Sequence, residues 1–151
     1  MKIPIGSIIK FANSFYSYLF KGAKIDGSLQ FYKGGQENDP NRCSFMLTLQ
    51  NNSKNNAYNI KVLNWEDIFY SMDKINPIIS LQPLHSTIVF YRFEDPTLNN
   101  FSQNTIPKNK IGKQLIISYS NEGRKTFYTK FIIDDNEAIN EYSIKNPLQK
   151  K

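Results

Sequence analysis

Apolar and polar residues alternate in two runs, residues 115–120 and 127–133, with a short polar segment between them. Alternation with a period of two is typical of strands that bury one face, so the two runs predict a β-hairpin. The polar segment suits a three-residue loop closed by Gly123 in the left-handed conformation. This loop predicts a register in which Ser120 lies opposite Arg124.

The two faces of this predicted hairpin carry different sets of apolar residues. One face supplies residues for a core: Leu115, Ile117, Phe127, Phe131 and Ile133. The opposite face carries Ile116, Tyr128 and Ile132, and an apolar face of this kind is either covered or used for binding. We expect an N-terminal helix to cover it through Phe11 and Phe15, or else a partner protein to dock there.

Further alternating runs predict the remaining strands, at residues 25–32, 43–50, 58–62, 78–81 and 87–94. Apolar residues at helical spacing predict an N-terminal helix over residues 7–20. A short crossover helix is expected over residues 64–76, with Asn64 as its N-cap. The tail after residue 138 is expected to form a turn of helix around Ile139, Tyr142 and Ile144.

One segment resembles a known family. Residues 47–62, LTLQNNSKNNAYNIKV, combine a strand, an Asn-rich turn and an Ala-x-Asn-hydrophobic-x-hydrophobic run. This pattern resembles immunoglobulin-like β-sandwiches of the bacterial cell-adhesion-related type, and the later turn at residues 81–83 extends the resemblance. The resemblance implies a non-catalytic spacer or interaction module, and it assigns no catalytic residue to this chain.

These patterns together predict a mainly β fold, an antiparallel immunoglobulin-like sandwich with an N-terminal helix and a short crossover helix. A chain of 151 residues with 40% hydrophobic content suits a single domain over residues 1–151. Within it we expect an N-terminal helical segment at 1–24, the β-sandwich at 25–134 and a C-terminal tail at 135–151.

The formal net charge of +6 is concentrated around the predicted hairpin. Its cationic residues are Lys108, Lys110, Lys113, Arg124, Lys125 and Lys130. Such charges can neutralise phosphates while Tyr128 or Tyr91 stacks on bases, so the segment 108–130 is a candidate nucleic-acid surface. The alternative is a solvated hairpin whose charges prevent edge-to-edge pairing.

Little in the sequence indicates catalysis. The single cysteine and single histidine exclude an internal disulfide and a two-histidine metal site, although a nucleophilic pair of Cys43 with His85 stays open. We expect His85 to be an ordinary turn histidine. No glycine-rich nucleotide motif is present, no cofactor or metal is expected, and Asp134 to Glu137 offer only a weak calcium pattern.

No apolar run approaches the length of a membrane span, and no signal peptide is evident, so a cytoplasmic location is the default expectation. We therefore expect a non-enzymatic protein-interaction module, for example a small accessory subunit of a larger bacterial or phage assembly. The first alternative is a nucleic-acid-binding protein that uses the basic hairpin. The second is a carbohydrate-binding sandwich that uses Trp65, Tyr91 or Tyr128.

Overall fold

The computed structural model describes residues 22–33, 42–68, 76–94, 106, 108–134 and 139–149. The predicted N-terminal helix, with Phe11 and Phe15, lies outside these residues, as do most of the predicted crossover helix and most of the segment 95–107. Side chains of residues 32–33, 42–44 and 90–94 are likewise not described.

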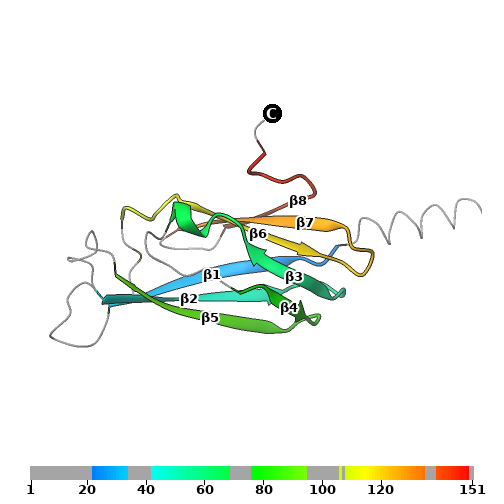
Figure 1. Cartoon of the computed structure of the whole chain (residues 1–151), viewed down its shortest axis with the longest axis horizontal. Coiled ribbons are helices and arrows are strands. Elements are labelled where there is room, and N and C mark those ends of the chain that lie inside the picture. Colours follow the sequence, from blue (N-terminus) through cyan, green and yellow to red (C-terminus); the bar gives the residue numbers. More distant parts are fainter. Residues whose placement is uncertain are drawn as a thin grey trace, which may run out of the picture.

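The described residues form two antiparallel sheets that pack as two layers (Figure 1). The strands are β1 (Ile25–Lys33), β2 (Arg42–Asn51), β3 (Ala57–Val62), β4 (Ile78–Leu81), β5 (Ser86–Glu94), β6 (Gln114–Ser120), β7 (Thr126–Ile132) and β8 (Ile139–Ser143). One sheet has the order β1-β2-β5 and the other the order β4-β3-β6-β7-β8. The predicted mainly β, antiparallel, two-sheet architecture is therefore confirmed.

The core lies between the facing sheets and is built by the alternation seen in the sequence. Phe31, Phe45 and Leu47 come from the three-stranded sheet, and Leu115 and Phe131 come from the five-stranded sheet, all at most 2% exposed. Because successive strand residues point to opposite faces, the apolar half of each run is buried against the other sheet.

The β6–β7 hairpin forms where it was predicted, but its loop lies one residue further along the chain. Ser120 pairs with Thr126 instead of lying opposite Arg124, and the left-handed conformation falls on Arg124 (φ 59°) instead of Gly123. The buried Asn121 explains the difference, since its side-chain oxygen accepts the N–H of Lys125 at 3.0 Å and its backbone N–H donates to the carbonyl of Lys125 at 3.1 Å. The register changes by an even number of positions, so each side chain keeps its predicted face.

The segment after β3 starts differently from the predicted helix over residues 64–76. Only a 3₁₀ turn, η1 (Trp65–Asp67), is present before the described stretch ends at Ile68. Asn64 does not cap it; its side-chain oxygen accepts the N–H of Ile116 and its Nδ2 donates to the carbonyl of Gln114, both at 2.7 Å. Asn64 thus extends the pairing of β6 beyond the end of β3.

The predicted helical turn in the C-terminal tail is wrong, because residues 139–143 form β8 and add a fifth strand to the sheet. The sandwich consequently extends beyond residue 134. Strand β8 has few apolar residues. Part of its inner face is polar, and these polar side chains form hydrogen bonds to the other sheet.

Side chains join the two sheets along the side where β1 and β8 lie next to each other. Asn140 of β8 accepts the N–H of Gly27 at 2.9 Å and donates to its carbonyl at 3.2 Å, so one amide satisfies both backbone groups. Thr129 donates to the carbonyl of Ile25 at 2.6 Å. The backbone at Gly27 passes close to β7, and a Cβ there would lie 3.2 Å from the Phe131 ring, which would have to shift slightly. These bonds fix the start of β1 against β8, where the candidate site lies.

Candidate functional site

The six cationic residues proposed for nucleic acid do not form one surface. Arg124 and Lys125 lie at the hairpin tip, whereas the segment 108–113 precedes β6 at the opposite end of the sheet (Figure 1). A seven-residue strand separates the two ends by roughly 20 Å. Two of the cations are also engaged, since the buried Lys110 donates to the carbonyl of Ile68 at 2.5 Å and Lys130 pairs with Glu141 at 2.5 Å.

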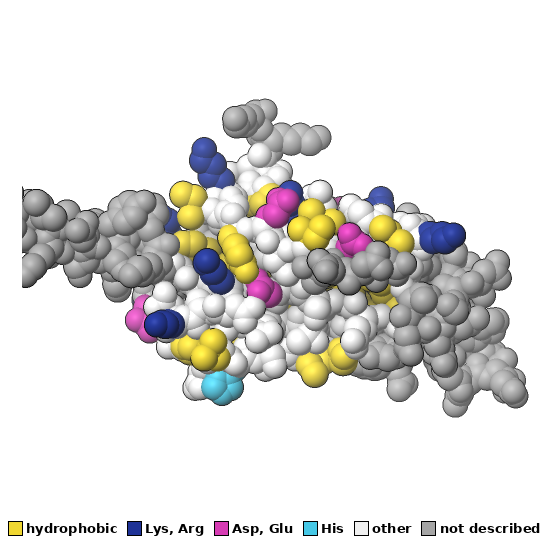
Figure 2. Space-filling view, turned by 180° about the vertical axis from the view of Figure 1, so that it is seen from behind, with side chains coloured by type: hydrophobic (Ala, Val, Ile, Leu, Met, Phe, Trp, Pro, Cys, Tyr) yellow, Lys and Arg dark blue, Asp and Glu magenta, His cyan; other side chains and the backbone are white. Residues whose placement is uncertain are grey.

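The outer hairpin face proposed for a partner is only partly open. Ile116 is 2% exposed, while Tyr128 and Ile132 are half-buried. Ile116 is therefore largely inaccessible in this structure. Phe11 and Phe15, the other residues predicted for this contact, lie outside the described part of the chain. On the face seen in Figure 2, hydrophobic side chains form separate small groups among charged residues instead of one continuous patch.

Two other sequence-based candidates are not supported by the geometry. Trp65 is 5% exposed and packs on Phe45 with ring centroids 4.7 Å apart, so it cannot stack on a sugar. Cys43 lies near the start of β2, whereas the backbone of His85 bonds to Asn51 at the other end of that strand, roughly 25 Å away. His85 itself is exposed and donates from Nδ1 to the carbonyl of Pro83 at 2.9 Å, as expected for a turn histidine.

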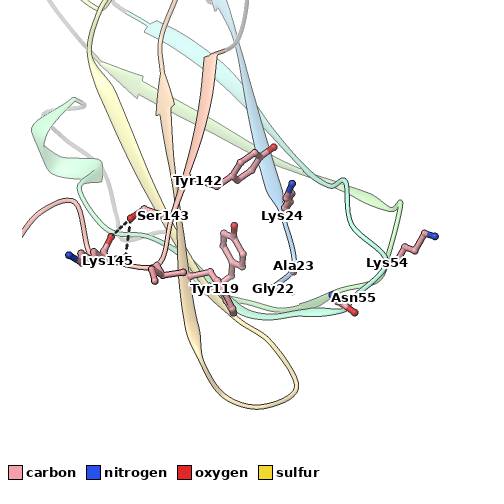
Figure 3. A pocket seen from close by; sticks show the side chains of 11 residues that line it. Gly22, Ala23, Lys24, Lys54, Asn55, Tyr119, Tyr142, Ser143 and Lys145 are labelled. Carbon is pink, nitrogen blue, oxygen red and sulfur yellow. Dashed lines mark hydrogen bonds between the residues drawn. The ribbon is translucent and has the colours of Figure 1, made fainter. Parts of the chain in front are cut away.

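The described residues form a pocket of about 710 Å³ at the hairpin-tip end of the sandwich. Four separate segments line it, and we call it the end pocket. The lining residues are Gly22, Ala23, Lys24, Lys54, Asn55, Tyr119, Phe127, Tyr142, Ser143, Ile144 and Lys145. Figure 3 shows Tyr142 and Tyr119 in the centre of this group, with Lys54 and Lys145 on opposite sides of it.

The floor of the end pocket is aromatic and firmly held. The rings of Tyr119 and Phe127 are stacked with centroids 6.2 Å apart, and the two side chains are 2% and 6% exposed. The Tyr119 hydroxyl hydrogen-bonds to Thr129 Oγ1 at 3.1 Å. Burial raises the pKa of Tyr119 above its ordinary value of 10.0, although the bond to Thr129 lowers it in part. Gly22 passes against the floor so closely that a Cβ would lie 2.6 Å from the Phe127 ring.

The wall above the floor comes from β8 and the segment that follows it. Tyr142 is 45% exposed, its hydroxyl donates to Asp26, and Lys24 Nζ lies 5.2 Å from its ring centroid in a cation–π contact. Desolvation raises the pKa of Tyr142, and the hydrogen bond to Asp26 adds to the effect. Both phenols therefore stay protonated at neutral pH, and the wall is an amphipathic surface in a defined position.

The rim of the end pocket is positively charged. Lys24, Lys54 and Lys145 line it, and the described lining residues include no carboxylate. Asp26 lies next to it and is engaged, because it accepts hydrogen bonds from Tyr142 and from the side chain of Asn52. A cleft lined by charges of one sign attracts ligands of the opposite sign.

Sequence patterns did not single out the end pocket because its parts are distant in the chain. The hairpin supplied one visible signal, a basic tip with an aromatic residue on each arm. The lysines of the rim come from the residue before β1, the turn after β2 and the segment after β8, and no binding motif includes them. Only the placement of β8 beside β1 brings them together.

A scan against protein-family models finds no match, and neither the curated proteins nor the solved structures that were searched contain a significant match. Within the described ranges no helix is both long and apolar enough to cross a bilayer. In the same part of the chain, His, Cys, Asp and Glu residues form no group of three or more that could hold a metal ion.

Proposed function

We propose that the protein is a non-enzymatic interaction module built on an immunoglobulin-like sandwich, and that it docks a partner protein in the end pocket. The observation that carries this proposal is the pocket itself, an aromatic hollow rimmed by lysines on a rigid two-sheet frame. A concave, mostly apolar site with a few convergent polar groups is the usual form of a binding site.

The lining chemistry supports binding in preference to turnover. The Ser143 hydroxyl donates to the carbonyl of Lys145 at 2.8 Å and accepts its N–H at 3.0 Å, so it is engaged in a local turn. Among the lining residues in the described part of the chain, no histidine or carboxylate can activate it as a base. Both tyrosine pKa values are raised, which moves the phenols away from acid–base work near neutral pH.

The immunoglobulin-like part of the proposal is supported by topology. The segment that carries the sequence resemblance forms β2, a turn and β3, and it crosses from one sheet to the other. Crossings of this type join the two sheets of such sandwiches. Fold alone does not assign a function, so the docking proposal is based on the end pocket.

The test is an affinity capture from native lysate with two matched variants. Ile144→Glu places a charge at the mouth of the pocket, whereas Ile88→Glu places one on the outer face of the other sheet, and the two isoleucines are similarly exposed, at 52% and 58%. We expect a protein that co-purifies with the wild-type chain and with Ile88→Glu but is lost with Ile144→Glu. A protein retained equally by both variants, or the capture of none, would refute docking in the pocket.

A further inference from the structure

The charge around the end pocket indicates the chemistry of what it binds. At the hairpin-tip end, the described cationic side chains are Lys24, Lys54, Arg124, Lys125 and Lys145, and the carboxylates are Asp26 and Glu122. One carboxylate is held by Tyr142 and Asn52, and the other accepts from Asn56 Nδ2 at 3.3 Å. Five cations against two engaged carboxylates leave a positive excess at this end of the sandwich, and three of the cations line the pocket, which complements an acidic ligand.

The interior of the pocket indicates a second requirement, an apolar anchor. Below the charged rim lie the stacked rings of Tyr119 and Phe127, and the exposed Tyr142 and Ile144 form the wall beside them. Anchors that fill such pockets are most often aromatic, because a flat ring buries a large area with few rotatable bonds. A ring inserted beside Tyr142 would contact the wall and the floor together.

The parts of the pocket are held in place by bonds within the chain. Lys24 is positioned over the Tyr142 ring, Tyr142 is bonded to Asp26, and the backbone of Lys145 is held by the turn made with Ser143. Pre-organised groups lose little conformational entropy when a ligand binds, so a short ligand can bind usefully.

A single-stranded nucleic acid fits this geometry less well than a peptide. Base stacking on successive platforms requires several open rings along a groove. Here the described lining offers one exposed ring, that of Tyr142, and Lys24 already lies over it. The other basic cluster, at residues 108–113, lies at the far end of the sheet, so no continuous track for phosphates is formed by the described residues.

We infer that the end pocket binds an acidic peptide segment that inserts one aromatic side chain onto the Tyr119–Phe127 floor and pairs its flanking carboxylates with Lys24, Lys54 and Lys145. The inference rests on the proposed docking function and names the class of partner segment. The peptide supplies both features at once, because aspartate and glutamate on each side of a phenylalanine place charge at the rim and a ring in the hollow.

The probes are fluorescein-labelled synthetic peptides titrated with the purified full chain and followed by fluorescence anisotropy. The first carries a phenylalanine flanked by two acidic residues on each side, the second has alanine in place of phenylalanine, and the third has lysines in place of the acids. We expect a Kd in the range of about 10–100 µM for the first peptide, at least tenfold weaker binding of the second and no binding of the third. Raising the salt from about 50 to 300 mM should weaken the first complex several-fold.

Two double variants test where the peptide binds. Lys54→Glu with Lys145→Glu reverses charge at the rim, and Lys61→Glu with Lys108→Glu makes the same change at exposed lysines outside the pocket. We expect the rim variant to lose at least tenfold in affinity for the acidic phenylalanine peptide and the control to retain it. Equal losses in both variants, or equal binding of all three peptides, would overturn the inference.

A ten-nucleotide oligothymidylate is included as a polyanion without peptide chemistry. Tighter binding of this oligonucleotide than of the acidic peptide, with the same loss in the rim variant, would assign the pocket to nucleic acid and overturn the inference. If the peptides fail but lysate capture still depends on Ile144, the docking proposal stands and only the acidic-aromatic class is wrong. If both fail, the docking proposal fails as well.

Discussion

Replacement of Asn51 by alanine should destabilise the protein more than most single substitutions. The side chain is 0% exposed at the end of β2, and it joins three segments of backbone. Its Nδ2 donates to the carbonyls of Asn55 at 2.8 Å and Leu81 at 3.0 Å. Its Oδ1 accepts the N–H of Ser53 at 3.1 Å and the Ser53 hydroxyl at 2.7 Å. Asn51 thus holds the turn that carries Lys54 and Asn55 and ties it to the end of β4.

The expected loss can be worked out bond by bond for Asn51→Ala. The carbonyl of Leu81 belongs to a buried residue, and loss of its donor costs about 1–3 kcal/mol. The bonds to Ser53 and Asn55 are half-buried, so water replaces them in part, at about 0.5 kcal/mol each. The Ser53 hydroxyl has a single proton, which in the variant passes to the carbonyl of Asn55 at 3.0 Å, so only two of these three bonds are lost. The sum is a loss of about 2–4 kcal/mol in the free energy of unfolding.

Urea denaturation followed by tryptophan fluorescence measures this loss directly. Trp65 is the only tryptophan in the chain and is 5% exposed, so its emission reports the exposure of the core. Gln50→Ala, one residue earlier at an exposed position, is the control and should change stability by less than about 0.5 kcal/mol. An Asn51→Ala protein within about 0.5 kcal/mol of wild type would refute the argument that this amide organises the end of the sandwich.

Three further predictions concern packing, the hairpin loop and ionisation. Gly27→Ala places a Cβ 3.2 Å from the Phe131 ring and should cost about 1–3 kcal/mol in urea unfolding, and a neutral result would show that the sheets can separate locally. Arg124→Gly removes a side chain from a residue at φ 59° and should raise the free energy of unfolding by about 0.5–1 kcal/mol, whereas Gly123→Ala should be tolerated because Gly123 has no positive φ. A loss of stability in Gly123→Ala with no gain in Arg124→Gly would instead support the register expected from sequence. The pKa of Tyr119 is raised in the folded protein above the unfolded value of 10.0. The contribution of the neutral Tyr119 phenol to the free energy of unfolding is therefore fully present below pH 10.0 and is lost as the pH rises through the folded pKa. Tyr119→Phe should therefore flatten the decline of stability with pH, and an unchanged slope would contradict the assignment.

Much of the strand layout follows from the sequence, because period-two alternation is a local property. Residues 25–32, 43–50 and 78–81 were expected as strands and are strands, extended by at most one residue at either end. The inner face of the hairpin was also predicted, since a register change of two positions leaves every side chain on its face. What local pattern did not show was the offset of the loop. Asn121, a buried side chain bonded to Lys125, determines it.

Charge patterning gave a weaker guide to the candidate site. The sequence grouped Lys108 and Lys110 with the hairpin tip because they are near it along the chain. The structure separates them by the length of β6 and buries Lys110 against the carbonyl of Ile68. Proximity in sequence does not imply proximity in space when a strand runs between the residues.

The amino-acid sequence by itself determined that this protein is a two-faced, antiparallel β structure with a basic hairpin, because burial of alternate residues is encoded locally. Tertiary structure decided that residues 139–143 pair as β8, since Asn140 and Tyr142 gain their partners only when β1 lies beside them. It also decided the position of the end pocket, whose lysines and rings come from four separate segments. Their meeting depends on how the two sheets pack, and no local pattern encodes that packing.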